Sequence, residues 1–383
     1  MPAADDAFVS LAQMLRAPLK REAPAAVAVV AEPVSAPAEP LALTELARDV
    51  RVLHARLAEA EAALAGRGPA DAPAVPAPGE RVALREPFWT GIRVLDGPLA
   101  FARGARIGIF GPPGAGKSTL IEQLVGGSRA EATVVALIGE RGREAERWLR
   151  RIGPSTSVVC ATSDRPAAER LAAASRAFAQ AAALRAHGLH VLLVLDSLAR
   201  VAAAARDLAV GAGEPVGRAG YPPSVTARLA ALLECAGAVA GGSITLVATV
   251  LSEGPLEHDP VAEAARAALD GHIVLSARLA AAGWFPAIDL PASASRTLTE
   301  VASEAHRLAA GRLRAAVAAL DAARDARSLG LDPAAGDRLL ARAIAAEDRI
   351  ARFLRQAEGG AAPAETLMEM TAIADSLDDG YLQ

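Results

Sequence analysis

Lysine is almost missing from this 383-residue chain. Lys20 and Lys117 are the only lysines, and the rest of the 40 lysine and arginine residues are arginines. Aromatic residues make up 3% of the chain, whereas hydrophobic residues make up 52%. Much of that hydrophobic content is alanine, so we expect a core of alanine, leucine and valine on closely packed helices.

An excess of positive charge is also missing. The formal net charge is -4, which argues against a nucleic-acid protein that relies on a broad basic surface. Cysteine is scarce as well. Cys160 and Cys235 stand in apolar surroundings without metal-ligand spacing, so we expect both to be buried thiols in a reducing compartment.

The chain shows neither a signal peptide nor a clear membrane span. Asp5 and Asp6 stand near the N-terminus, where a signal peptide would have a basic region followed by an apolar one. The nearest approach to a span is the charge-free stretch 235–252. Its glycines, serines and threonines favour a helix end, a glycine turn and a buried strand over a membrane helix.

One of the two lysines lies in a phosphate-binding motif. Residues 111–119 read Gly-Pro-Pro-Gly-Ala-Gly-Lys-Ser-Thr and match G-x-x-x-x-G-K-[ST]. The sequence predicts a buried strand at 106–110 before it and a helix at 120–125 after it. Glycines let backbone N–H groups reach phosphate oxygens, and a helix N-terminus favours an anion. The candidate nucleotide-binding residues are therefore Gly111, Gly114, Ala115, Gly116, Lys117, Ser118 and Thr119.

Within this motif each polar side chain has an expected partner. Lys117 supplies a positive charge for the β- and γ-phosphates of a nucleotide, and the Ser118 hydroxyl is placed to hold Mg²⁺. Pro112 and Pro113 each lack a donor N–H. The amides that face the phosphates come after them in the chain, so we expect nucleotide binding to be retained.

Two carboxylates follow other predicted strands. Asp196 comes directly after the strand 191–195, which is the Walker-B position that binds Mg²⁺ through water. Glu140 follows the strand 133–138 and has the chemistry to orient a water in line with the γ-phosphate. On spacing alone, a surface salt bridge with Arg141 or Arg143 is an equally good interpretation of Glu140.

Strands and helices alternate over the middle of the chain, which indicates an α/β fold. Near-continuous Val, Leu and Ile runs predict a mainly parallel sheet that is covered on both faces. Besides the segments already named, we expect strands at 157–161, 244–250 and 273–275, the last of them. We expect further helices at 144–151 and 166–186, from after 196 through 208, and at 222–236, 300–329, 333–356 and 362–376.

Residues 1–79 differ from the rest of the chain. A short amphipathic helix is expected at 8–15, and the prolines among the alanines that follow it predict a linker. Leucine and valine then recur at steps of three and four over 43–65, which predicts a helix. That helix is either a coiled coil or docked on the chain's own globular domain. A second linker follows at 66–79.

The middle of the chain resembles the hexameric rotary-type ATPases, and within them the ATPases of type III secretion and flagellar export. The resemblance covers about 81–356 and includes Thr-Gly-Ile-Arg-Val-Leu-Asp-Gly at 90–97. Its most specific blocks are Gly-Tyr-Pro-Pro-Ser at 220–224 and Asp-Gly-His-Ile-Val-Leu-Ser at 270–276. The resemblance implies a RecA-like P-loop ATPase domain at 80–298 and a helical C-terminal domain at 299–383, and we expect residues 1–79 to form an N-terminal extension.

The resemblance also implies roles for individual residues around the phosphate loop. Glu140 matches the family's catalytic glutamate, and Asp196 matches its Walker-B carboxylate. Arg141 matches an arginine that contacts the γ-phosphate.

Three further residues are singled out by the same resemblance. Arg296 matches an arginine finger that reaches the nucleotide of the neighbouring subunit and stabilises charge on the transferred phosphoryl group. Phe285 stands where the family has an aromatic residue that packs on adenine. Trp284 beside it is unusual for the family.

The function implied by the resemblance is ATP hydrolysis, with Mg²⁺, by a homo-oligomeric ring that is a hexamer. Hydrolysis would energise type III protein export through cargo unfolding or chaperone release. The implied partners are a central stalk, peripheral stator proteins and secreted proteins with their chaperones. Neither nucleic acid nor a transmembrane segment is implied, and the ring would sit peripherally at the cytoplasmic face of the bacterial inner membrane.

One departure from the family is expected, and two other functions stay open. Family members carry an N-terminal β-barrel, but 1–79 shows no run of alternating strands, so we expect the barrel to be absent. The chain could instead be a nucleotide-binding scaffold subunit with weak turnover. A nucleic-acid-dependent ring NTPase is the other alternative, although the N-terminal region lacks the aromatic and basic residues that RNA binding requires.

Overall fold

The computed structural model describes residues 75–150, 153, 155–251, 259–357 and 359–378. The expected helix at 8–15, the heptad pattern at 43–65 and most of both linkers lie outside these residues. The expected absence of a β-barrel concerns the same part of the chain and is not tested.

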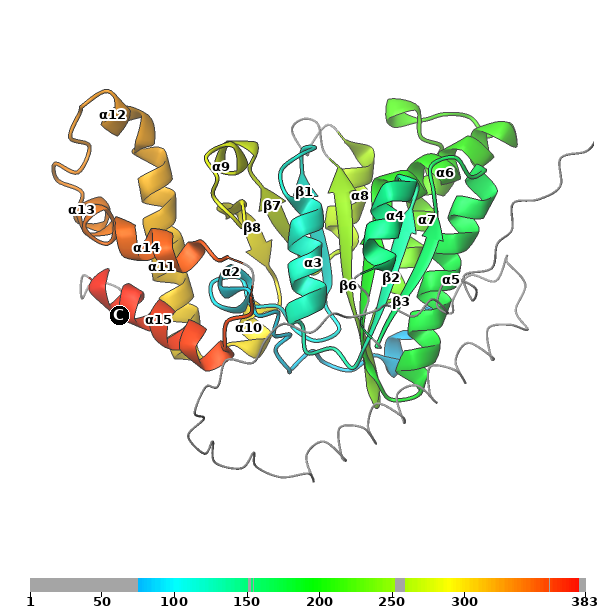
Figure 1. Ribbon diagram of the computed structural model, residues 1–383, viewed down its shortest axis with the longest axis horizontal. Coiled ribbons are helices and arrows are strands. Elements are labelled where there is room, and N and C mark those ends of the chain that lie inside the picture. Colours follow the sequence, from blue (N-terminus) through cyan, green and yellow to red (C-terminus); the bar gives the residue numbers. More distant parts are fainter. Residues whose placement is uncertain (1–74, 151–152, 154, 252–258, 358, 379–383) are drawn as a thin grey trace, which may run out of the picture. The chain divides into compact units, whose positions relative to one another are not determined.

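A twisted sheet of eight strands forms the centre of the described chain (Figure 1). Its order is β3-β2-β4-β6-β1-β7-β8, and β5 pairs with β6 off this path. The strands from β3 to β7 along the path run parallel, whereas β8 is antiparallel to β7 and β5 to β6. The bounds are β1 Arg106–Gly111, β2 Ala132–Ile138, β3 Thr156–Ala161, β4 His190–Asp196, β5 Gly237–Val239, β6 Gly242–Leu251, β7 Gly271–Leu275 and β8 Ile288–Ser295.

Helices cover both faces of this sheet, because alternate residues of each strand point to opposite sides. In β2, Val135 and Leu137 join one buried cluster with residues of α3 and α4, whereas Val134 and Ala136 join a second cluster with α5 to α8. Buried alanines such as Ala177 let α5 lie close to the strands. The bounds are α3 Lys117–Gly127, α4 Gly142–Leu149, α5 Ala167–Ala186, α6 Leu198–Gly211, α7 Pro223–Glu234 and α8 Pro260–Ala268.

The C-terminal part of the described chain is helical and packs beside β8 (Figure 1). α11 contacts β8, α13 and α15, and α15 also contacts the short helix α2, Arg93–Asp96. The α/β class with a helical C-terminal domain is thereby confirmed. The bounds are α9 Ala277–Ala281, α10 Leu298–Val301, α11 Glu304–Ala322, α12 Arg324–Ser328, α13 Arg338–Ala345, α14 Glu347–Leu354 and α15 Pro363–Ser376; η1 Pro78–Glu80 and η2 Arg218–Gly220 are 3-10 turns.

Several boundaries differ from the sequence predictions. The strand at 273–275 is not the last, because β8 follows it; β8 contains Pro291, which an edge strand tolerates since one side of its backbone needs no partner. The single helix expected at 300–329 is divided, and α11 starts anew where Ser303 accepts a hydrogen bond from the N–H of His306. The helix expected at 333–356 begins only at α13 and is divided at Ala346.

The two cysteines have different environments. Cys235 is buried at the end of α7, as expected. The prediction is wrong for Cys160, which is exposed. Cys160 lies on β3, the edge strand at the other end of the sheet from β8, where fewer neighbours cover the side chains.

The charge-free stretch after α7 forms sheet structure. β5 turns through Gly241, at a φ of 90°, into β6, which continues to Leu251. This is the glycine turn and buried strand that the sequence predicted. Among the helices of the described residues, none combines the length and the apolar character that crossing a membrane requires.

Candidate nucleotide site

The phosphate loop joins β1 to α3. β1 ends at Gly111 and α3 begins at Lys117. Between them, Gly114 and Gly116 have φ values of 77° and 90°, which glycine adopts without the steric penalty of a Cβ. Ala115 is buried, with 1% of its surface exposed. The loop therefore turns tightly in front of the α3 N-terminus, where unpaired helix N–H groups favour an anion.

Lys117 lies folded into this loop. Its Nζ donates hydrogen bonds to the carbonyl oxygens of Gly111 at 2.8 Å and Pro112 at 2.7 Å. Burial lowers the pKa of the ammonium, and the charges of Asp196 and Glu140 act against that shift. Pro112 lacks an N–H but supplies one of the two acceptors that hold the lysine.

Asp196 and Glu140 come from neighbouring parallel strands. Leu137 of β2 pairs with Asp196 of β4, so Glu140, just beyond the end of β2, lies at the same carboxyl edge of the sheet. Asp196 is 9% exposed and accepts a hydrogen bond of 2.6 Å from the hydroxyl of Thr249. Burial raises the pKa of Asp196. Burial, followed by the charge of Asp196, raises the pKa of Glu140 to about 7.

Two residues that the sequence analysis missed hold Glu140. Arg200, in the first turn of α6, places its Nε 3.3 Å from Glu140 Oε1. Glu144, in α4, hydrogen-bonds the Glu140 side chain and raises its pKa further. Glu140 therefore pairs with Arg200. Within the described residues, neither Arg141 nor Arg143 forms an ion pair with Glu140. The signal available in the sequence was the spacing of these residues. Glu144 follows Glu140 by four residues, and Arg200 follows Asp196 by four residues.

These groups line one pocket of about 350 Å³. The structure thus brings together most of the residues that the sequence singled out. Gly111, the last residue of β1, and Ala115, which is buried in the loop, are not among the lining residues. Arg141, exposed at the N-cap of α4, is not part of the lining. The lining residues are Pro113, Gly114, Gly116, Lys117, Ser118, Thr119, Glu140, Glu144, Asp196, Ser197, Arg200 and Leu251.

The pocket offers oxygen ligands to a cation. Ser118 and Asp196 both line it, and Mg²⁺ prefers such oxygen donors. Within the described residues, no group of three or more His, Cys, Asp and Glu could hold a metal. A small donor set fits Mg²⁺, which commonly uses one or two protein ligands together with phosphate oxygens and waters.

Phe285 lies against the phosphate loop. A Cβ built on Gly116 would be 3.6 Å from Cε1 of the Phe285 ring. The side chain is 45% exposed, so part of the ring is open beside the loop. The neighbouring Trp284 ring is covered by the guanidinium of Arg355, whose Cζ lies 4.2 Å from the ring centroid.

Arg296 lies away from the pocket of its own chain. It follows β8, and its N–H donates to the carbonyl of Asp270 at 2.9 Å. Because β8 runs antiparallel to β7, its last residue, Ser295, pairs with Gly271 at the start of β7. Arg296 therefore lies near the amino ends of the parallel strands, whereas the phosphate loop lies at their carboxyl ends.

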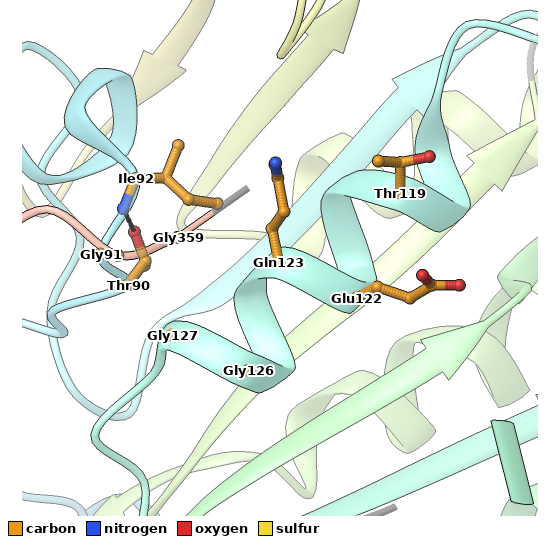
Figure 2. A pocket seen from close by; sticks show the side chains of 10 residues that line it. Thr90, Gly91, Ile92, Thr119, Glu122, Gln123, Gly126, Gly127 and Gly359 are labelled. Carbon is orange, nitrogen blue, oxygen red and sulfur yellow. Dashed lines mark hydrogen bonds between the residues drawn. The ribbon is translucent and has the colours of Figure 1, made fainter. Parts of the chain in front are cut away.

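A second cavity of about 360 Å³ runs along α3. Thr119 lines both cavities, so the two lie on either side of this residue. Figure 2 shows Thr119, Glu122 and Gln123 projecting from α3, with the loop of Thr90 and its neighbours facing them. The lining is completed by Gly91, Ile92, Gly126, Gly127, Gly359 and Gly360.

The facing loop of this second cavity is fixed by a buried carboxylate. Asp96 accepts hydrogen bonds from the N–H and hydroxyl of Thr90 and from the N–H of Gly91, at 2.7 to 2.8 Å. Burial raises the pKa of Asp96 to about 6. The hydroxyl of Thr90 also accepts from the N–H of Ile92 (Figure 2).

Comparison with known protein families shows to which family the chain belongs. Residues 91–295, more than half of the chain, match the nucleotide-binding domain of the ATP synthase alpha/beta family. The chain belongs to this family. Residues 302–372 match the C-terminal domain of the T3SS EscN ATPase, so within this family the chain resembles the ATPases of type III secretion and flagellar export.

Individual relatives agree with this placement. The type 3 secretion system ATPase of Sinorhizobium fredii is 48% identical over 288 residues, which cover 74% of this chain and 64% of the relative. The flagellum-specific ATP synthase of Salmonella typhimurium is 42% identical over 286 residues, 73% of this chain and 63% of the relative. The chain thus spans somewhat less than two thirds of the length of these two relatives.

A solved structure shares the fold. The assembled ATPase EscN from the type III secretion system of enteropathogenic E. coli is 38% identical and superposes with a TM-score of 0.76, covering 80% of this chain and 76% of that chain. The resemblance found in the sequence, to type III secretion and flagellar export ATPases, is confirmed.

Proposed function

We propose that this chain binds ATP together with Mg²⁺ and hydrolyses it to ADP and phosphate. The observation that carries the proposal is the meeting of Lys117, Glu140 and Asp196 in one pocket at the carboxyl edge of the sheet. Ligands of open α/β sheets bind at that edge. Membership of the ATP synthase alpha/beta family supports the choice of nucleotide.

The phosphate chain of ATP would lie in the loop in front of α3. Backbone N–H groups from Gly114 to Thr119 would donate to its oxygens. Lys117 would exchange its two carbonyl partners for the β- and γ-phosphates. Ser118 and Asp196 would hold Mg²⁺, which offsets negative charge on the phosphates when bound.

Glu140 would prepare the water for hydrolysis. A carboxylate in this place accepts a hydrogen bond from the attacking water and orients it toward the γ-phosphate. With a pKa of about 7, Glu140 is partly ionised at neutral pH, and Arg200 keeps its carboxylate directed into the pocket. Arg141, the exposed neighbour of Glu140, would contact the γ-phosphate.

Phe285 would stack on the base of the nucleotide. Its partly exposed ring lies beside Gly116, and a phenyl ring offers the same flat apolar face as other aromatic residues that bind a base. The base would therefore extend from the phosphate loop toward Phe285 and the adjoining cavity along α3.

We infer that the active assembly is a homo-oligomeric ring, because Arg296 lies at the far end of the parallel strands from its own pocket. The resemblance to hexameric rotary-type ATPases suggests that the ring is a hexamer. In a ring it would reach the nucleotide of the neighbouring subunit as an arginine finger. EscN has been solved as an assembled ATPase and in complex with its central stalk EscO. By analogy, a central stalk, peripheral stator proteins and secreted proteins with chaperones would be partners of this chain, at the inner face of the bacterial inner membrane.

The ring would energise type III protein export through cargo unfolding or chaperone release. The residue ranges 1–79, 80–298 and 299–383 remain our proposed division into extension, ATPase domain and helical C-terminal domain. The same remote position of Arg296 also favours a second candidate, a nucleotide-binding scaffold subunit whose turnover is weak because its site stays incomplete.

Phosphate release and nucleotide binding, measured separately, test the proposal. Lys117→Ala should weaken ATP binding and lower turnover by about 10²-fold or more, since it removes a preorganised charge from the phosphates. Glu140→Gln should keep binding and lose turnover to a similar extent. Arg103→Gln, which removes an exposed ion pair with Glu86 outside the pocket, is the control. If Glu140→Gln hydrolyses ATP as fast as the unmodified chain, the scaffold interpretation gains and the catalytic one is overturned.

A further inference from the structure

Gln356, just beyond the end of α14, is hydrogen-bonded to four other residues of the chain. Its backbone N–H donates to the carbonyl of Phe285 at 3.0 Å. Its side-chain Nε2 donates to the carbonyls of Gly91 at 2.6 Å and Gly359 at 2.9 Å. Its Oε1 accepts from the N–H of Arg93 at 2.8 Å. The side-chain amide thus uses both donor hydrogens and its acceptor within the protein.

The segments that Gln356 joins are the ones around the proposed base. Phe285 carries the ring beside Gly116 of the phosphate loop, whereas Gly91 and Gly359 line the cavity along α3. Thr119 lines both that cavity and the phosphate pocket. One residue therefore contacts both the backbone of Phe285 and the glycines of the cavity wall.

Gln356 itself is held firmly from the side of α2. The guanidinium of Arg93 donates to the carbonyls of Phe353 at 2.8 Å and Arg352 at 2.9 Å, at the C-terminal end of α14. A positive charge is favourable at a helix C-terminus. The N–H of Ala361 also donates to Gly91 at 2.8 Å. The segment after α14 is thus attached to the loop at 90–93 on both sides of Gln356.

The Phe285 ring depends on its backbone for its position. With 45% of its surface exposed, the side chain has few neighbours that could hold it by packing. The hydrogen bond from the Gln356 N–H holds the backbone of Phe285 instead, and the Arg355 guanidinium over the Trp284 ring holds the preceding side chain. This gives Trp284, which the sequence left without a role, a place in the same arrangement.

We propose that Gln356 is a positioning residue for the base of the nucleotide, because it holds the backbone of Phe285 and the glycine wall of the adjoining cavity in place. The inference rests on the proposed nucleotide site and adds a residue to it. The side chain of Gln356 fixes its own backbone between Gly91, Arg93 and Gly359, and the N–H of that backbone holds the carbonyl of Phe285. The side chain thus acts on Phe285 indirectly and does not touch the phosphates. Its loss should therefore weaken ligands that carry a base and leave base-free polyphosphate binding unchanged.

The amide group, and not the volume of the side chain, is what the arrangement requires. Gln356→Glu keeps the shape but replaces two N–H donors with a carboxylate oxygen that faces the carbonyls of Gly91 and Gly359. Gln356→Ala removes all three side-chain hydrogen bonds. Both variants should therefore weaken base-dependent binding, whereas a residue that only fills space would tolerate glutamate.

The experiment compares binding of Mg²⁺-ADP with binding of Mg²⁺-tripolyphosphate, which has no base, by calorimetry on the full chain. For Gln356→Ala and Gln356→Glu we expect ADP affinity to fall by about five- to tenfold and tripolyphosphate affinity to stay within twofold. Phe285→Ala should show the same pattern. In the double variant Gln356→Ala with Phe285→Ala the two losses should not add, because both act on one contact.

His306→Ala is the matched control. His306 Nε2 makes a similar side-chain-to-backbone contact, 2.8 Å from the carbonyl of Gly97, and so ties α11 to the C-terminal end of α2 without reaching Phe285. Its ADP affinity should match that of the unmodified chain, and melting temperatures of all variants show whether they are folded. If Gln356→Ala does not fold, Gln356→Glu and Phe285→Ala carry the comparison.

Two results would overturn the inference. Equal weakening of ADP and tripolyphosphate in the Gln356 variants would make Gln356 a general structural residue, and unchanged ADP affinity would remove its role altogether. Failure of the unmodified chain to bind either ligand would instead contradict the proposed function, so the two failures are distinguishable.

Discussion

The guanidinium Nε of Arg200 lies 3.3 Å from Oε1 of Glu140, and this pair joins the first turn of α6 to the end of β2. Gly139, beside Glu140, leaves room for it, since a Cβ there would lie 2.8 Å from Cδ of Arg200. Burial and Asp196 raise the pKa of Glu140 to about 7, and the charge of Arg200 opposes them. Arg200 therefore favours the ionised form of a partly buried carboxylate that would act on water.

Arg200→Ala should lower ATP turnover near neutral pH. Without the guanidinium, the pKa of Glu140 rises further and less of the carboxylate is ionised at pH 7. Because Arg200 is partly exposed and its charge is screened, we expect a loss of about three- to tenfold at pH 7. The measurement is turnover against pH. For the unmodified chain it should rise through about 7, and for the variant the midpoint should lie higher. Reduced turnover with an unshifted midpoint would show that Arg200 does not act through Glu140.

Gly139→Ala should disturb the same pair from the backbone side. Gly139 has a φ of 72°, which costs alanine about 1 kcal/mol, and the added methyl would also displace Arg200. We expect a stability loss of about 1–2 kcal/mol together with reduced turnover. Gly213→Ala is the control, because Gly213 has a φ of 83° but no atom within 4 Å of an added Cβ. Equal turnover losses in the two variants would count against a specific effect on Arg200.

Most of the site could be predicted because its chemistry is local in sequence. The phosphate loop, with Lys117, is one continuous motif, and Asp196 directly follows a recognisable apolar strand. Arg200 and Glu144 were missed because their roles depend on where the first turns of two helices point after folding. Gln356 was missed for a stronger reason, since two of its partners, Gly91 and Arg93, lie more than 200 residues away in the sequence and only tertiary packing brings them together.

The same holds for the fold: features encoded by neighbouring residues in the sequence could be predicted, whereas features that depend on tertiary packing could not. Continuous Val, Leu and Ile runs predicted the parallel strands, which are buried on both faces. The strand β8 carries a proline and an aspartate, and it is stabilised by pairing with β7 at the sheet edge, so its own sequence pattern is weak. Cys160 looked buried because its neighbours are apolar, but the edge position of β3 leaves it exposed.

His190 should make the fold sensitive to acid. It is 2% exposed, its Nε2 lies 2.9 Å from the Thr245 hydroxyl, and burial, aided by Arg103, lowers its pKa from 6.5 to about 4. Between these values the unfolded chain binds more protons than the folded one, so stability falls as pH decreases from 6.5 toward 4. The full difference corresponds to about 3 kcal/mol.

The contribution of His190 can be isolated by comparison with His190→Gln. Asp96 and Glu140 have raised pKa values and favour the folded state as pH falls, so the total pH dependence mixes opposite effects. The difference in unfolding free energy between the two proteins removes these common terms. It should shrink as pH falls from 6.5 toward 4, measured by urea unfolding. A difference that is constant over this window would show that His190 does not change its protonation there.

The sharing of the active site between subunits is tested most directly by ATP turnover per subunit as a function of protein concentration, for the unmodified chain and for Arg296→Ala. The account predicts a rate that rises steeply with concentration and falls by about 10³-fold or more in the variant, because the arginine of one subunit completes the site of the next. A rate per subunit that is independent of concentration and unaffected by Arg296→Ala would contradict the shared site and with it the ring ATPase.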